Sequence, residues 1–168
     1  MIFCEKRIAA ALALILFTFT GFSTAAETVR LPTEGSQSHD SNYATAYASS
    51  CIWPYASAQL INVTNSFISI KSPSAAKISM EANIYTYNTV EKIGFISLTL
   101  QEWTDSGWID LYSYKDRYSN NEDSFSFQKS ETIGISSGNY YRLTAELHAK
   151  DGTLTDTKTY TTDYIVAR

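Results

Sequence analysis

The chain has 168 residues, 44% of them hydrophobic, and a formal net charge of −4 at pH 7. This length and apolar content are enough for the core of one domain, so a single domain is expected. DNA and RNA are poor candidates as partners, because nucleic-acid binding needs a basic face and this chain is mildly acidic.

Residues 1–26 have the layout of a signal peptide. Lys6 and Arg7 precede an apolar run over residues 8–22, and small residues follow up to Ala26. The run is shorter than the roughly 20 apolar residues of a membrane-spanning helix. We therefore predict cleavage after Ala26 and a secreted, extracellular protein that does not span the membrane. Cleavage changes the formal charge from −4 to −5, because two positive charges and one negative charge leave together.

Cys51 is the one cysteine that remains after this cleavage, since the chain has 2 cysteines and the other is Cys4. An exported domain with a single thiol has no internal disulfide, so its stability must come from packing. Two interpretations of Cys51 remain open: a partly buried thiol, or an intermolecular disulfide.

Residues 27–57 form a polar lead-in, and residues 58–168 form the predicted β domain. The lead-in is rich in Ser, Ala, Thr, Asn and Asp, with few branched aliphatic residues. The domain begins with two brief strand candidates at 59–63 and 67–70. Over residues 78–84 apolar side chains then occupy every second position, the pattern of a strand with one buried face.

A hairpin is predicted over residues 93–115, with its turn at Asp105-Ser106-Gly107. Residues 116–123 are interpreted as a polar loop. A calcium site there is the alternative, although the spacing lacks the alternating acidic ligands and central glycine of a dedicated calcium loop. A further strand is expected over residues 125–128.

The last hairpin follows at residues 140–166. Tyr141, Leu143, Ala145 and Leu147 alternate with polar side chains, and Asp151-Gly152 is a typical two-residue turn. A Thr-rich strand over residues 153–166 completes the hairpin. The spacing before Tyr141 also fits a tyrosine corner, in which the tyrosine hydroxyl bonds to the backbone of the turn just before it.

These patterns predict an all-β fold, an antiparallel immunoglobulin/fibronectin III-like sandwich of about seven strands. Residues 74–166 resemble fibronectin type III and immunoglobulin-like domains. They are more similar to a family of small secreted Gram-positive bacterial proteins that carries a domain-of-unknown-function label. The resemblance implies export and this fold, and it brings no catalytic residues. It runs through Ile96-Ser97-Leu98-Thr99-Leu100-Gln101-Glu102-Trp103, Gly107-Trp108-Ile109-Asp110 and Ser136-Ser137-Gly138-Asn139-Tyr140-Tyr141-Arg142-Leu143.

The residues that carry most enzyme chemistry are sparse. The only histidines are His39, in the lead-in, and His148, on the polar side of a strand, and neither lies in a catalytic motif. Two distant histidines and one cysteine make a poor zinc site. We therefore expect a protein that is not an enzyme and holds no metal or cofactor.

One group of residues suggests a binding surface. Aromatic and charged side chains share the outward side of the predicted hairpin and of the following strand, where rings can stack on sugars or anchor a protein partner. The alternative is that they cover the second face of the sheet or pack under the lead-in. We predict a non-enzymatic binding or surface-associated module that engages an extracellular protein or a cell-envelope component, with a carbohydrate-binding module as the alternative. The candidate residues are Trp103, Trp108, Tyr112, Tyr114, Tyr140, Arg142 and Glu146.

Overall fold

The structure is a computed structural model that describes residues 31–33, 45–50, 61, 63–74, 76–132 and 138–167. Its elements are β1 (Thr45–Ser50), β2 (Val63–Ser74), β3 (Lys77–Thr104), β4 (Gly107–Thr132), β5 (Tyr140–Asp151), β6 (Leu154–Thr161) and β7 (Ile165–Val166). All of them pair antiparallel in one seven-stranded sheet, and these residues include no helix. The predicted all-β antiparallel class is confirmed.

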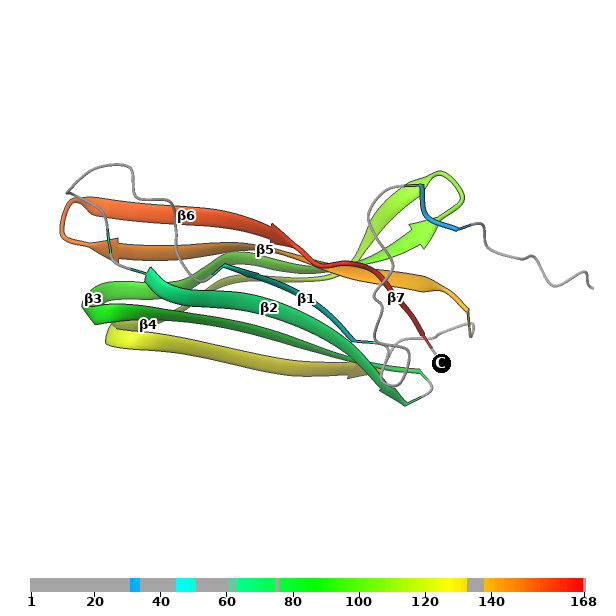
Figure 1. The fold of residues 1–168 in the computed structure, drawn as a ribbon, viewed down its shortest axis with the longest axis horizontal. Coiled ribbons are helices and arrows are strands. Elements are labelled where there is room, and N and C mark those ends of the chain that lie inside the picture. The colour runs from blue at the N-terminus through cyan, green and yellow to red at the C-terminus, as the bar shows by residue number, and fades with distance from the viewer. Residues whose placement is uncertain are drawn as a thin grey trace, which may run out of the picture.

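The sheet curls over so that it forms two facing layers (Figure 1). The order of strands along the sheet is β1-β2-β3-β5-β6, and β4 pairs with β3 over nearly the full length of both. The first part of β3 pairs with β2, and its last part pairs with β5. Because β3 and β4 run through both layers, the layers are parts of one sheet rather than the two separate sheets of the predicted immunoglobulin or fibronectin subtype.

The predicted loop at 116–123 is wrong, because β4 continues through it without interruption. Asp116 and Asn121 have φ angles of 53° and 56°, and the β3–β4 register shifts between the pairs made by Tyr85 and Val90. Asp and Asn tolerate the left-handed backbone region better than most residues. These polar residues therefore bend a strand instead of ending it.

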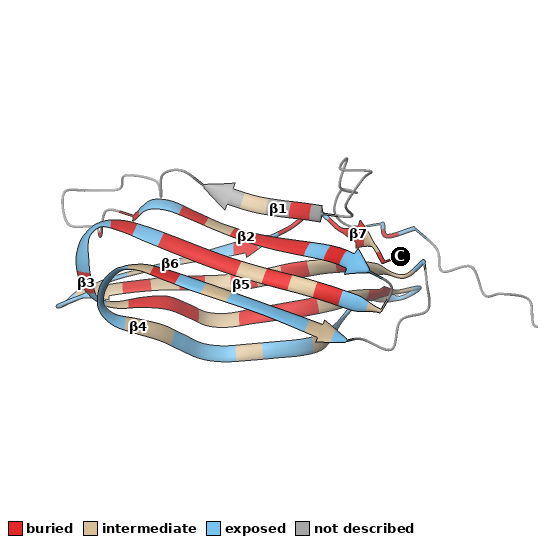
Figure 2. Cartoon of the chain, turned by 90° about the horizontal axis from the view of Figure 1, so that it is seen from below, coloured by how far each residue is buried: buried red, intermediate tan, exposed pale blue. Residues whose placement is uncertain are grey.

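The core lies between the two layers, where the alternating apolar side chains of both meet. Buried and half-buried residues alternate along β5, whereas the outer strand β4 is largely exposed (Figure 2). At the centre, the ring of Phe95 contacts the rings of Phe125 and Phe127 edge to face, at centroid distances of 5.6 and 5.2 Å. The alternation that predicted the strand at 78–84 is confirmed, since Ile78, Met80, Ala82 and Ile84 are all fully buried.

Two polar contacts tie the layers together at opposite sides of the core. On one side, Ser66 of β2 and Tyr160 of β6 share a buried hydrogen bond between their hydroxyl groups. On the other side, the hydroxyl of Tyr114 donates to the carboxylate of Glu131, although both residues belong to β4. Tyr114 lies in the first half of β4 and Glu131 near its end, so the curl of the sheet brings these two parts of the strand together.

Both predicted hairpins are present, with one adjustment. The turn at Asp105-Ser106 joins β3 to β4 as predicted. At the second hairpin Asp151 already pairs with Leu154, so the two loop residues are Gly152 and Thr153. Gly152 supplies the positive φ, 58°, that this tight connection requires.

The end of the chain differs from the single strand predicted over 153–166. It divides into β6 and β7, both of which pair with β5. Between them, Thr162 bonds twice to Leu143: its amide donates to the Leu143 carbonyl at 2.9 Å, and its Oγ1 accepts from the Leu143 amide at 3.0 Å. The break places Tyr164 beside the start of β5.

The hydroxyl of Tyr141 donates to Oε1 of Glu102 at 2.9 Å, on the neighbouring strand β3. The tyrosine corner, which concerns the turn expected before Tyr141, stays a prediction. Residues 133–137 of that turn lie outside the described residues.

Part of the predicted lead-in is a strand, since β1 pairs with β2 from Thr45 to Ser50. The signal-peptide residues and Cys51 lie outside the described part of the chain. Within that part, no helix is long and apolar enough to cross a membrane.

Candidate binding surface at the tip of the β3–β4 hairpin

The tip of the β3–β4 hairpin carries a pair of tryptophans. Trp103, near the end of β3, lies directly opposite Trp108, near the start of β4. Their rings pack edge to face, with centroids 5.3 Å apart and an interplanar angle of 64°. Aromatic pairs on opposite strands stabilise a hairpin, which accounts for two large rings beside a tight turn.

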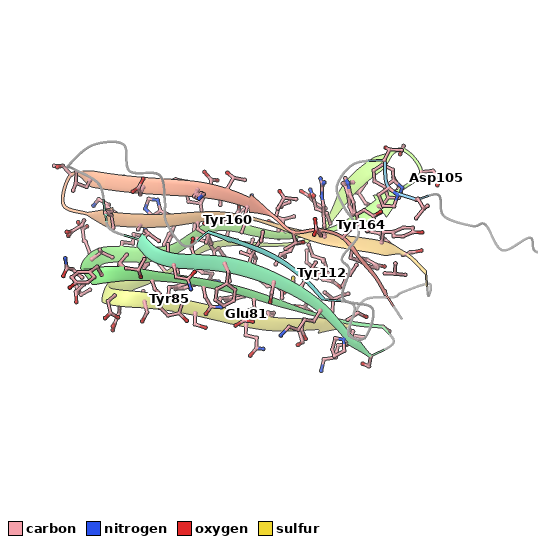
Figure 3. The ribbon with its side chains drawn as sticks, in the orientation of Figure 1. Glu81, Tyr85, Asp105, Tyr112, Tyr160 and Tyr164 are labelled. Carbon is pink, nitrogen blue, oxygen red and sulfur yellow. The ribbon has the colours of Figure 1, made fainter. Side chains whose placement is uncertain are left out.

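Three further side chains join this pair and complete what we call the tip cluster. Tyr164, which precedes β7, lies 6.2 Å from Trp108 and 5.6 Å from Tyr140 between ring centroids. Arg142 of β5 reaches over Trp108, with its guanidinium carbon 4.3 Å from the ring centre. Figure 3 shows Tyr164 at the base of the hairpin whose turn carries Asp105. The tip cluster therefore consists of Trp103, Trp108, Tyr140, Arg142 and Tyr164.

A polar row beside the tip cluster holds Arg142 in place. Its Nε donates to Oε1 of Gln101 at 2.8 Å, and Nε2 of Gln101 donates to Oδ1 of Asp110 at 2.8 Å. The three residues lie opposite one another on β5, β3 and β4. The row thus fixes the guanidinium plane above Trp108, where the cation is attracted to the ring face.

Among the described residues, neither indole N–H group of the tip cluster has a hydrogen-bond partner. The Nε1 atoms of Trp103 and Trp108 are buried, and Trp103 as a whole is only 6% exposed. A buried donor without an acceptor costs about 1–3 kcal/mol, so such groups are uncommon in folded proteins. The two indoles therefore pack tightly at the tip at the expense of their hydrogen bonds.

The structure separates the seven predicted site residues into three groups. Trp103, Trp108, Tyr140 and Arg142 come together in the tip cluster, but Trp103 is buried there, whereas the prediction placed its ring on an outward surface. The other three, Tyr112, Tyr114 and Glu146, lie elsewhere.

A β-bulge at Leu111 explains why Tyr112 and Tyr114 are displaced. Asp110 lies opposite Gln101, but Tyr112 lies opposite Leu100, so β4 contains one extra residue at this point. A one-residue bulge inverts the alternation of faces along the strand. Tyr112 and Tyr114 therefore lie on the face of β4 opposite to Trp108. Tyr114 packs on Phe127 with ring centroids 5.4 Å apart, whereas Tyr112 is 36% exposed. The sequence prediction that they share a face with Trp108 is wrong.

Glu146 is on the same face as Arg142 but farther along β5, next to a second group of residues. There Tyr118 packs edge to face on His148 at 5.6 Å, and the ammonium of Lys92 lies 3.7 Å from the Tyr118 ring centre. Burial and the positive charge of Lys92 lower the pKa of His148, and the negative charge of Glu146 opposes them. This second group is polar and does not extend the tip cluster.

Sequence reasoning missed Tyr164, which is 7% exposed and contacts two members of the tip cluster. A single strand over 153–166 would not have set this residue apart from its neighbours. Its position depends on Thr162-Asp163, where the regular pairing with β5 stops.

Comparison of the chain with protein-family models, with curated proteins and with solved structures found no match to any of them. Within the described residues, no three His, Cys, Asp or Glu side chains gather in a way that could hold a metal ion. The tip cluster contains no nucleophile paired with a base, and its chemistry is that of rings, N–H donors and one cation.

Proposed function

We propose that the protein is a secreted, non-enzymatic binding module and that the tip cluster is its ligand-binding surface. The observation that carries the proposal is the gathering of two tryptophans, two tyrosines and one arginine in the tip cluster. Tryptophan, tyrosine and arginine are also the residues that contribute most of the binding free energy in protein interfaces. The tip cluster contains all three.

The geometry favours a protein partner over a glycan. Stacking on a sugar needs an open, flat ring face, but the Arg142 guanidinium covers one face of Trp108 and Trp103 is almost completely buried. Tyr112, a further ring expected on this surface, lies on the opposite face of the sheet.

Retention of the purified protein on isolated cell envelopes tests this function. Wild type should be retained, and protease treatment of the envelopes should abolish retention whereas periodate oxidation of their glycans should not. Trp108→Ala should lose retention. Tyr112→Ala is the matched control, because it removes a ring from the same strand on the other face, and it should be retained like wild type.

Circular dichroism and thermal unfolding establish that both variants are folded. Equal retention of Trp108→Ala and wild type would remove the tip cluster as the binding surface. Loss of retention after periodate, and not after protease, would replace the protein partner by a glycan.

A further inference from the structure

The strand β6 forms a regular edge of the sheet. It lies at the margin of the sheet (orange-red in Figure 1), and among the described residues it pairs with β5 alone. This pairing has no register shift, and no residue of β6 has a positive φ angle. The other long edge, β4, is interrupted by the bulge at Leu111 and by the positive φ angles of Asp116 and Asn121. Since a further strand pairs best with a regular edge, β6 is the better place for one.

The backbone groups at the open side of β6 belong to its threonines. The amide of Thr162, the residue after β6, donates to the Leu143 carbonyl of β5 at 2.9 Å. In an antiparallel pair, the amides that point to the neighbouring strand occur at every second residue. The amides of Thr155, Thr157 and Thr159 therefore point away from β5. These three threonines are exposed, so this stretch of the strand is accessible.

Two charged side chains alternate with these threonines on the core side of β6. Asp156 lies opposite Ala149 and Lys158 lies opposite Leu147, and both of these β5 residues are buried in the core. Asp156 and Lys158 are themselves half-buried. Burial raises the pKa of Asp156, because its carboxylate is partly removed from water. An inward-pointing charge on an edge strand opposes further pairing, unless the added strand brings an opposite charge.

A second copy of β6 brings that opposite charge. When two copies run antiparallel with Thr157 facing Thr157, Asp156 of each copy lies opposite Lys158 of the other. In the same register Thr155 lies opposite Thr159, and the amides on the open sides of the two strands face one another. Opposite charges and threonine pairs at facing positions stabilise neighbouring strands. This register also has a two-fold axis, the commonest symmetry of protein dimers.

We propose that the protein forms a dimer in which β6 pairs antiparallel with β6 of a second copy, centred on Thr157 and with reciprocal contacts between Asp156 and Lys158. This surface is separate from the tip cluster, and the proposal does not depend on the proposed function. Because Tyr164 of the tip cluster follows the end of β6, antiparallel pairing would place the two tip clusters at opposite ends of the dimer.

Sedimentation velocity over a series of protein concentrations tests the dimer. Wild type should change from monomer to dimer as its concentration rises. Thr157→Pro should stay monomeric, because proline has no amide to donate at the centre of the contact. Since that amide points away from β5, the pairing of β6 with β5 should be retained, and circular dichroism verifies the fold. Thr157→Val is the matched control, because it keeps the amide and a branched side chain, and it should still dimerise.

Charge reversal tests the register without a change in the backbone. Asp156→Lys and Lys158→Asp each place like charges opposite one another at two symmetric positions. Each variant alone should dimerise about tenfold more weakly than wild type, or worse. An equimolar mixture of the two variants should form a dimer again, because every reversed charge then faces an opposite charge.

Three results would each overturn the proposal: a wild type that is monomeric at every concentration, a dimer of folded Thr157→Pro, or a mixture of the charge variants that stays monomeric. The first result would leave Lys158 as a charge that protects the edge from pairing. Trp108→Ala should sediment like wild type, since it changes only the tip cluster. Failure of the dimer and failure of envelope retention are therefore distinguishable.

Discussion

The hydroxyl of Tyr141 on β5 donates a 2.9 Å hydrogen bond to the Glu102 carboxylate on β3. Asn139 donates to the same oxygen through Nδ2. Tyr141 is 1% exposed, so this bond is made at the edge of the core, one residue from Trp103. It links β5 to the hairpin that carries the tip cluster.

Replacing Tyr141 by phenylalanine should destabilise the protein by about 1.5–3 kcal/mol, the usual contribution of a hydrogen bond to a charged group. Urea unfolding followed by circular dichroism measures the change. Tyr87→Phe, at an exposed position, is the control and should leave the unfolding midpoint unchanged. An unchanged midpoint for Tyr141→Phe would show that the bond to Glu102 contributes nothing to stability.

Tyrosine ionisation should occur in two phases. Burial and hydrogen bonds to carboxylates raise the pKa of Tyr114 and of Tyr141 well above the ordinary value of 10. Burial and Asp116 raise the pKa of Tyr118 in the same direction. Absorbance of phenolate at alkaline pH should therefore show ordinary tyrosines first and these residues later, and Tyr141→Phe should reduce only the later phase.

The raised tyrosine pKa values also make the stability of the folded protein depend on pH. A tyrosine whose folded-state pKa is raised contributes stability that is present below pH 10 and is lost as pH rises through the folded-state pKa. The protein should unfold in the pH range of the later phase. Titration of all tyrosines together near pH 10 in the folded protein would contradict this prediction.

Gly94→Ala should be strongly destabilising. A Cβ at this position would lie 2.0 Å from the carbonyl oxygen of Arg117 on β4, so the β3–β4 pairing must shift. Overpacking against backbone costs about 1–3 kcal/mol or more. Gly107→Ala is a matched comparison, because Gly107 also has a positive φ, 144°, but has open space around its Cβ position. Thermal unfolding should show the larger loss for Gly94→Ala, and equal losses would rule out the steric explanation.

His148 should make stability depend on pH below neutrality. Burial and the charges of Lys92 and Lys150 lower its pKa below 6.5, in spite of the opposing charge of Glu146. A lowered histidine pKa contributes stability that is present above pH 6.5 and is lost as pH falls through the folded-state pKa. Urea midpoints for wild type should fall over this range, and His148→Gln should remove that part of the decrease.

A further variant tests whether the positive charge of Lys92 lowers the pKa of His148. Lys92→Gln removes a cation from beside His148 and should raise its pKa, measured from the imidazole proton shifts. Lys71→Gln, at an exposed position on β2, should leave it unchanged. A His148 pKa that does not respond to Lys92→Gln would remove the charge of Lys92 as a cause.

The sequence predicted the strands through their alternation but could not predict how far they continue. The apolar residues that alternate over 78–84 and 141–147 are buried, and both strand predictions are confirmed, although Asn83 between two of them is buried as well. The polar run at 116–123 has the composition of a loop, yet β3 supplies pairing partners along it. A polar composition indicates that a segment is exposed to solvent. Because a strand at the outside of a sheet is exposed too, composition did not separate a loop from a strand here.

The candidate site was predicted only in part, because the faces of its later residues depend on strand pairing that the sequence does not show. Trp103 and Trp108 were brought together by a turn that is evident in the sequence. The bulge at Leu111 has no signature there, because an extra residue in a strand is defined by its partner. Tyr112 and Tyr114, which follow the bulge, were therefore assigned to the wrong face. Tyr164 was missed because its position depends on the break between β6 and β7.

The long outer strand β4 is also relevant to aggregation of the protein. Within the described part of the chain β4 pairs with β3 alone, so its other side presents backbone groups over 26 residues. An uninterrupted edge of that length would template the addition of further strands and lead to aggregation. The positive φ angles at Asp116 and Asn121, the bulge at Leu111 and the many charged side chains divide it into short, bent pieces. Straightening this edge, for example by Asn121→Val, would be expected to shorten the time before the protein aggregates in a thioflavin assay.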